Sequence, residues 1–305
     1  MGAVEWWMLF FLALLWGGSF FFIDVAVRSL PPLTLVLLRL SGAALTLNIV
    51  VQFTGNPLPR SWRQWRPFFP LSLIMCALPF SLISWGQIWI SSGLASILNA
   101  TTPLFTLVIA HYLTADEKLS RPRVVAVLLG IAGIVVMIGT DALRNIGGQV
   151  PAQFAVLGAA MSYAFAGVTG RGVQRGGGLS HLASATMMVP CAALLMLPVA
   201  LLVDQPWQLP MPGPAAWGSV LGLAVMSTAV AYILYFRLLA TAGAVNLTLV
   251  TFLVPVTSIA LGTLVLHERL SLNHIFGMAL IAAGLLAIDG RLVNRLRALA
   301  GNPRS

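Results

Sequence analysis

The sequence predicts an all-α integral membrane protein with ten transmembrane helices, arranged as two inverted five-helix repeats around a central cavity. Of its 305 residues, 59% are hydrophobic and only 8% are charged, which is too little charge to cover a water-facing surface. Ten apolar segments each approach the length of a bilayer-spanning helix, which needs about 20 residues. A motif of acid, base, Leu and Ser also occurs twice, at 117–120 and 268–271.

Short gaps rich in Pro, Gly or charged residues separate the ten apolar segments, and none of these gaps is long enough for a soluble domain. The segments lack the ten-residue alternating pattern that is typical of a transmembrane β-barrel. We expect spans at residues 5–27, 32–52, 67–89, 92–114, 122–139, 151–172, 181–203, 215–238, 243–266 and 272–290.

The distribution of basic residues predicts that both termini are cytoplasmic. With the N-terminus inside, the cytoplasmic segments hold 13 of the 17 Lys and Arg residues and the outside segments hold 3. Lys and Arg favour cytoplasmic loops. Because these loop residues account for most of the formal net charge of +9, and no nucleic-acid-binding motif occurs, we expect no nucleic-acid partner.

The repeated motif marks an internal duplication. When Glu117 is aligned with Glu268, Gly133 also aligns with Gly284. Ser residues that close the two motifs are suitable N-caps for the helices that follow. We interpret the two acids as members of loop ion pairs and leave them out of the predicted substrate site.

Each half of the duplication holds five spans, residues 1–145 in the N-terminal repeat and residues 146–305 in the C-terminal repeat. Because five is an odd number, the second repeat must enter the membrane in the opposite orientation. We therefore expect the two copies of the motif to lie on opposite faces of the bilayer.

Three stretches of the chain resemble EamA-type proteins of the drug/metabolite transporter superfamily. They are LLWGGSFFFIDVAVRSLPPLTLVLLRL at 14–40, NATTPLFTLVIAHYLTADEKLS at 99–120 and VTFLVPVTSIALGTLVLHERLS at 250–271. The resemblance implies ten helices, alternating access and a place in the bacterial inner membrane. It implies export of amino acids, aromatic and other neutral ones included. The alternatives are export of another small metabolite (a sugar phosphate, a nucleotide sugar or a drug-like compound) or a lipid flippase.

Two prolines within spans direct attention to the middle of the bilayer, where inverted-repeat transporters hold their substrate. Pro103 and Pro255 each lack a backbone N–H, which frees the carbonyl four residues earlier, at Asn99 and Thr251. We predict that these carbonyls contact the ammonium group of the substrate. The alternative is a packed kink in which Thr102 or a neighbouring helix satisfies the backbone.

Four aromatic residues are predicted to line the cavity. Trp16 and Tyr163 lie in the middle of the first and sixth spans. Trp85 on the third span and Tyr232 on the eighth are predicted to line the cavity on similar grounds. Bilayer-facing Trp and Tyr prefer the interfaces, so those at greater depth need a polar partner or a cavity. The alternative is ordinary packing between helices.

Arg39 is the one Lys or Arg that lies well inside a predicted span. A charge at that depth is costly and usually has a partner. Asp24 is the nearest candidate in the sequence, so the two are predicted to form a gate or another intramembrane ion pair. The alternatives are an Arg that binds a substrate carboxylate and an Arg whose side chain reaches up to the outer surface.

No group of residues points to an enzyme. The sequence has no phosphate-binding loop for ATP, and its four His and two Cys residues are scattered. We therefore expect no catalytic residues, no metal and no cofactor. The expected partners are a small-molecule substrate, which is an amino acid, and the lipid bilayer. The sequence leaves the oligomeric state open, and a monomer is compatible with it.

Overall fold

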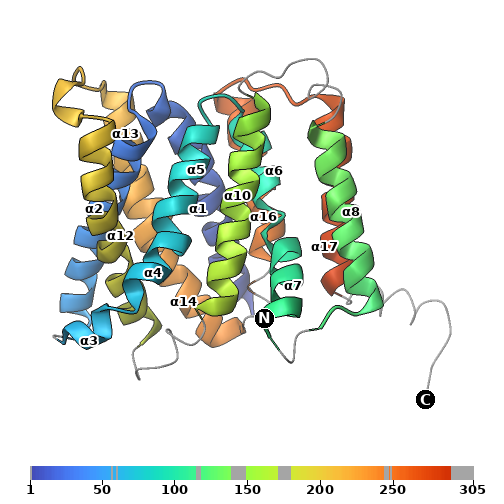
Figure 1. Cartoon of the computed structure of the whole chain (residues 1–305), viewed down its shortest axis with the longest axis horizontal. Helices are drawn as coiled ribbons and strands as arrows, with labels where there is room; N and C mark the ends of the chain where they lie inside the picture. The colour runs from blue at the N-terminus through green and yellow to red at the C-terminus, as the bar shows by residue number, and fades with distance from the viewer. Residues whose placement is uncertain are drawn as a thin grey trace.

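Ten helical spans follow one another in the computed structural model of the chain (Figure 1). Eight helices are long and apolar enough to cross a membrane, and two shorter apolar helices complete the set. This confirms the predicted fold class. The structure describes residues 2–55, 58–59, 61–114, 118–138, 149–170, 180–243, 247 and 249–289.

The first five spans differ from one another in how regular they are. The third combines several short helices, and the fourth is divided in two. Their elements are α1 (Ala3–Val27), α2 (Pro32–Phe53), α3 (Trp62–Trp65), α4 (Phe68–Ser72), η1 (Leu73–Ala77), α5 (Leu78–Gly86), α6 (Ser92–Asn99), α7 (Thr102–Leu113) and α8 (Arg121–Ile138).

The last five spans repeat this plan, with an irregular helix again in the third position of the half. The elements are α10 (Gln149–Thr169), α12 (His181–Val203), the 3₁₀ turn η2 (Pro206–Gln208), α13 (Pro214–Leu221), η3 (Gly222–Val230), α14 (Ala231–Ala242), α16 (Val250–Val265) and α17 (Leu272–Asp289).

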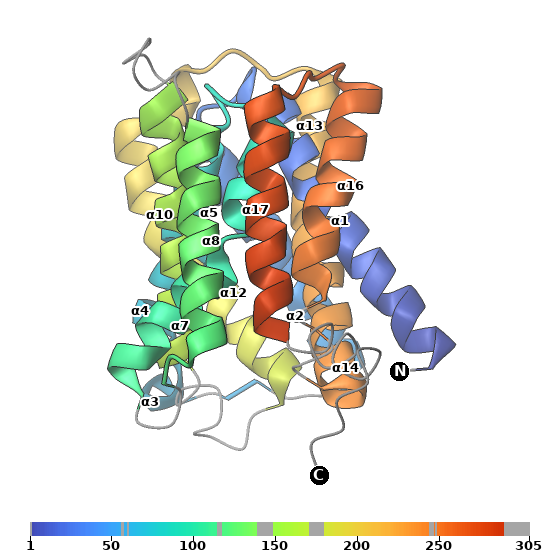
Figure 2. The same cartoon turned by 90° about the vertical axis from the view of Figure 1, so that its right-hand side faces the viewer.

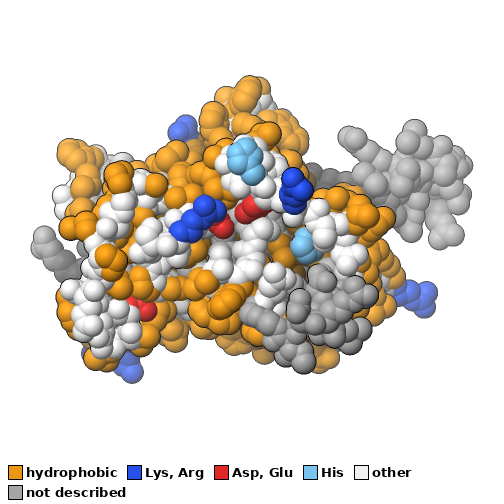
Figure 3. All heavy atoms as spheres, turned by 90° about the horizontal axis from the view of Figure 1, so that it is seen from above, with side chains coloured by type: hydrophobic (Ala, Val, Ile, Leu, Met, Phe, Trp, Pro, Cys, Tyr) orange, Lys and Arg blue, Asp and Glu red, His pale blue; other side chains and the backbone are white. Residues whose placement is uncertain are grey.

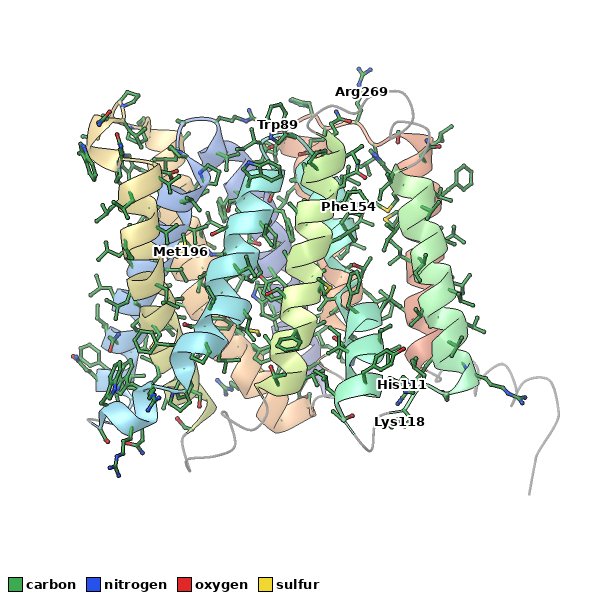
Figure 4. The ribbon with its side chains drawn as sticks, viewed as in Figure 1. Trp89, His111, Lys118, Phe154, Met196 and Arg269 are labelled. Atoms are coloured by element: carbon green, nitrogen blue, oxygen red, sulfur yellow. The ribbon has the colours of Figure 1, made fainter. Side chains whose placement is uncertain are left out.

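The two halves have opposite orientations in the bundle. Lys118 and Arg269, which occupy the same place in the two copies of the motif, lie at opposite ends (Figure 4). We refer to these as the Lys118 end and the Arg269 end. Helix α1 begins and α17 finishes at the Lys118 end (Figures 1 and 2). Glu117 and the predicted repeat boundary after residue 145 lie outside the described residues, so that boundary stays a prediction.

Both halves contain a π-helical segment in their third span. η1 runs directly into α5, where Pro79 removes a backbone N–H and disfavours regular α-helical bonding in the preceding turn. η3 occupies the equivalent span of the second half, and the Thr228 hydroxyl donates to the carbonyl of Leu223, 2.8 Å away. π-helical turns are rare and often occur at functional sites, so the pair directs attention to the side chains that they carry.

The fourth and ninth spans accommodate their prolines differently. α6 ends at Asn99 and α7 begins at Thr102, which places Pro103 in the first turn of α7, where its missing N–H is tolerated. The predicted continuous span is therefore two helices. In the ninth span, Pro255 lies inside α16, which continues through it.

Glycines allow the closest helix pairs to approach. α8 packs along α17, and a Cβ added at Gly133 would lie 2.7 Å from the carbonyl oxygen of Gly277. α1 packs on α16, where a Cβ at Gly17 would lie 2.8 Å from the carbonyl oxygen of Val254. Small residues are the usual contacts between transmembrane helices.

Candidate functional site

Arg39 projects from α2 into the bundle and is only 6% exposed. Its Nε donates a 3.0 Å hydrogen bond to the Thr228 hydroxyl of η3. The central carbon of its guanidinium group lies 3.8 Å from the centre of the Phe80 ring on α5. These contacts fix the orientation of the guanidinium plane and cover one of its faces, which leaves its terminal edge as the part available to a ligand.

Two tyrosines and a cysteine surround this arginine. Tyr163 of α10, Tyr232 of α14 and Cys76 of η1 all lie close enough to Arg39 to interact electrostatically with it. The Cys76 sulfur is 3.7 Å from the Tyr232 hydroxyl. The Tyr163 ring meets the Phe80 ring edge to face, with centroids 6.5 Å apart. We call this group the Arg39 cluster: Arg39, Cys76, Phe80, Tyr163, Thr228 and Tyr232.

The predicted ion pair between Asp24 and Arg39 is wrong. Among the described residues, the one salt bridge joins Asp24 to Arg28, one helical turn further along α1. The i,i+4 spacing places those two side chains on one face of the same helix, near its end. Arg39 therefore has no carboxylate partner within the described part of the chain, although a buried cation usually requires one.

Trp16 makes its ring contact with an aromatic residue outside the Arg39 cluster. Its ring packs at 5.6 Å, centroid to centroid, on the ring of Tyr235 of α14. Tyr235 lies three residues after Tyr232, so both side chains lie on one face of α14. That spacing was the sequence signal by which Tyr235 could have been recognised as a neighbour of the predicted site. The half-buried side chain of Tyr163 packs against both hydrophobic core clusters of the bundle and so bridges the two regions.

Trp85 makes none of the described contacts of the Arg39 cluster. Its side chain is 40% exposed, as is that of Leu78, two turns earlier on α5, at 42%. A side chain that lines a cavity and one that faces lipid are both exposed on the bundle, so the place of Trp85 in the cavity wall stays a prediction.

At the break between α6 and α7, the structure matches the alternative in which Thr102 satisfies the backbone. The Thr102 hydroxyl donates a 2.7 Å hydrogen bond to the carbonyl of Asn99, the group that Pro103 cannot bond. The backbone is thus satisfied locally. The side-chain Oδ1 of Asn99 is buried and has no hydrogen-bond partner among the described residues. The side chain of Asn99, rather than its carbonyl, is the group that a ligand would find here.

Pro255 is buried in α16, which packs mainly against α1 and α6. Near this crossing, the Thr257 hydroxyl donates to the carbonyl of Ala13, 2.9 Å away. The proline therefore belongs to a tightly packed helix pair. Thr251 lies on the same helix, one turn before the proline.

Sequence reasoning missed Cys76 and Phe80 as site residues. Cys76 and Phe80 are four residues apart around Pro79, so they lie on one face of the third span. A Cys and a Phe in an apolar segment are otherwise indistinguishable from core. Within the described residues, no group of three or more His, Cys, Asp or Glu side chains is arranged to hold a metal ion.

Helices from two oppositely oriented halves, packed into one bundle around a buried arginine, form the architecture of a multi-pass membrane transporter. The chain belongs to the EamA-like transporter family, whose sequence profile matches residues 5–139 and 150–288. A solved crystal structure aligns with it at a TM-score of 0.65 and 19% identity, covering 96% of this chain and 99% of its own. That likeness shows the fold.

Several bacterial transporters are similar over most of their length. YoaV, an uncharacterized transporter of Bacillus subtilis, is 24% identical over 274 residues, which cover 90% of this chain and 92% of YoaV. Protein PecM of Dickeya dadantii is 26% identical over 284 residues, covering 92% and 90%. YedA, an uncharacterized inner membrane transporter of Escherichia coli, is 26% identical over 269 residues, covering 86% and 83%.

Proposed function

We propose that this protein exports amino acids, including aromatic and other neutral ones, across the bacterial inner membrane by alternating access, with both termini in the cytoplasm. The observation that carries the proposal is the Arg39 cluster. It combines a buried cation that has no carboxylate partner among the described residues with three aromatic rings. A substrate carboxylate would supply the missing negative charge.

The geometry of Arg39 suits a carboxylate. Thr228 holds Nε and Phe80 covers one face, so the two terminal nitrogens present a planar pair of donors. Guanidinium groups bind carboxylates through two parallel hydrogen bonds, and such charge-assisted bonds are about twice as strong as neutral ones. Little solvent competes at a site that is this deeply buried.

The remaining parts of an amino acid also find candidate contacts. The rings of Phe80, Tyr163 and Tyr232 offer an apolar surface with two hydroxyl groups, which suits an aromatic or large neutral side chain. Asn99, whose Oδ1 has no partner among the described residues, is the proposed acceptor for the ammonium group. Trp16, packed on Tyr235, is proposed as a further aromatic contact.

A phosphorylated cargo fits less well. A phosphate monoester carries close to two negative charges at neutral pH. Among the described residues, Arg39 is the one buried Lys or Arg. One guanidinium balances a carboxylate but leaves most of a second charge uncompensated, so a sugar phosphate or nucleotide sugar is the weaker candidate.

Counterflow in proteoliposomes tests the proposal. Vesicles loaded with unlabelled phenylalanine, leucine or alanine should accumulate the same labelled amino acid. Phenethylamine, which lacks the carboxylate, should neither enter nor compete. Glucose 6-phosphate and a fluorescent phospholipid serve as the alternative cargoes. Movement of either alternative, with no exchange of any amino acid in the panel, would overturn the proposed function.

A further inference from the structure

A carboxylate of the second repeat caps a helix of the first repeat at the Arg269 end. Glu268, in the loop between α16 and α17, lies at the N-terminus of α6. The backbone N–H of Ser92 donates to its Oε1 at 2.8 Å, and that of Gly93 donates to its Oε2 at 3.2 Å. A negative charge at a helix N-terminus is stabilised by the unpaired N–H groups and by the helix dipole. The expected loop ion pair is thus replaced by a contact between repeats.

A second carboxylate makes the same kind of contact. Asp204, which ends α12, accepts hydrogen bonds from the backbone N–H and the hydroxyl of Thr34, at 2.6 and 2.9 Å. Thr34 lies in the first turn of α2 and is buried. This acid also comes from the second repeat, and the helix that it caps also comes from the first.

Both caps lie at the same end of the bundle, because α2 and α6 both begin there (Figure 1). Figure 3, which views this end, shows acidic side chains near the middle of the face with basic ones beside them. The loop hydrogen bonds described at the Lys118 end join residues of one repeat, such as that from Lys118 Nζ to the carbonyl of His111 at 2.8 Å. Among the described residues, the two carboxylate caps therefore join the repeats at the Arg269 end.

We propose that Glu268 and Asp204 form a two-point gate that holds the Arg269 end closed, and that both carboxylates leave α6 and α2 when this end opens. The inference rests on the alternating access of the proposed function. Each contact can be exchanged for water, because water satisfies carboxylates and helix N–H groups alike. Contacts of this kind are specific in the closed state and can be reversed at moderate cost.

Neighbouring charges help to separate the gate from its surroundings. Asp24 lies near enough to Glu268 to interact electrostatically, but its salt bridge to Arg28 stays within α1 and does not join the repeats. Arg269 follows Glu268 directly, and its side chain points away from the bundle (Figure 4). Arg269 therefore offers a matched control, since its substitution changes the charge of the same loop without removing a cap.

Labelling in nanodiscs tests the gate independently of any substrate. Ser96→Cys places a thiol on α6, one turn below the cap, where the native side chain is buried. Glu268→Gln or Asp204→Asn should raise its reaction rate with a polar maleimide about tenfold above the background of the parent, because a neutral amide replaces a charged acceptor. Arg269→Gln should leave the rate unchanged. Equal rates in all four backgrounds would overturn the gate.

A reversible cross-link provides the second test. In the double variant Thr34→Cys with Asp204→Cys, oxidation joins the two repeats by a disulfide where the native side chains touch. Amino-acid exchange should stop on oxidation and return on reduction, while each single variant is unaffected by the oxidant. Undiminished exchange through a fully cross-linked protein would refute the gate. If the parent exchanges no amino acid, the proposed function fails while the labelling test still reports on the gate.

Discussion

Arg39 Nε and the hydroxyl of Thr228 form a hydrogen bond of 3.0 Å between residues 189 positions apart, one from each repeat. The same hydroxyl donates to the carbonyl of Leu223, so its own proton is directed away from the arginine. The cation is therefore held by a single neutral acceptor from the described residues. This arrangement supports the proposed role of Arg39 in ligand binding over a role in stability.

Replacing Arg39 should separate those two roles. Arg39→Met should abolish carboxylate recognition and raise the apparent Kd for phenylalanine at least a hundredfold, since charge-assisted bonds of about 3 kcal/mol are lost. It should also raise the thermal unfolding midpoint by about 3 °C, because an uncompensated buried charge is removed. Binding and unfolding are measured on the same purified sample. A lower midpoint would indicate instead that the arginine locks the helices together.

The two tyrosines of the Arg39 cluster should act through their rings. Tyr163→Ala and Tyr232→Ala should each raise the KM for phenylalanine about tenfold, because one ring contact and its buried area are lost. The corresponding Phe variants should retain most of the activity. Trp7→Ala removes a larger aromatic side chain from an exposed position near the start of α1 and is the control. Reduced exchange in that control alone would contradict this assignment of the site.

The Asn99 side chain should distinguish ligands that carry an ammonium group from ligands that lack one. Asn99→Leu should weaken competition by phenylalanine about tenfold, because one buried acceptor for a charged donor is lost, and should leave competition by 3-phenylpropionate unchanged. The two compounds differ in the amino group, so the ratio of their inhibition constants isolates that contact. Thr102→Val should lower expression or thermal stability without changing this ratio, because its hydroxyl serves the backbone. Equal losses for both ligands would remove Asn99 from ammonium binding.

Gly262 offers a way to disturb the gate without changing any charge. A Cβ at this position would collide with the Glu268 carboxylate and would lie 2.8 Å from the Ser92 hydroxyl. Gly262→Ala should therefore displace the cap and speed the labelling of Ser96→Cys, as Glu268→Gln does. Gly218→Ala is the control, because a Cβ there meets nothing within 4 Å. Slow labelling in Gly262→Ala would mean that the carboxylate can move aside and still cap α6.

The number and orientation of the spans could be predicted because they depend on local properties of the chain. Apolar length locates a helix in the bilayer, and the repeated motif with an odd number of spans between its copies requires an inverted second half. Tyr163 and Tyr232 were predicted as site residues from their depth, and the structure places both near Arg39. Both lie deep in spans, where a polar hydroxyl needs a partner.

The errors concern rotation and long-range pairing. Asp24 pairs with Arg28 on its own helix rather than with Arg39, and no apolar alternation marks the inner face when lipid and core are both hydrophobic. Glu268 and the N–H of Ser92 are 176 residues apart, so no local pattern connects them. The Thr102 bond to Asn99, by contrast, was foreseen as an alternative because it is local.

In the proposed alternating-access cycle, the guanidinium of Arg39 should make transport sensitive to membrane voltage. As water access to this fixed charge alternates between the two faces, the electric field across the bundle is redistributed around it. One elementary charge that traverses the full field is worth about 2.3 kcal/mol per 100 mV. A zwitterionic amino acid leaves the positive charge in place, whereas a ligand with only a carboxylate neutralises it. The conformational step of the cycle should therefore respond to potential differently with each.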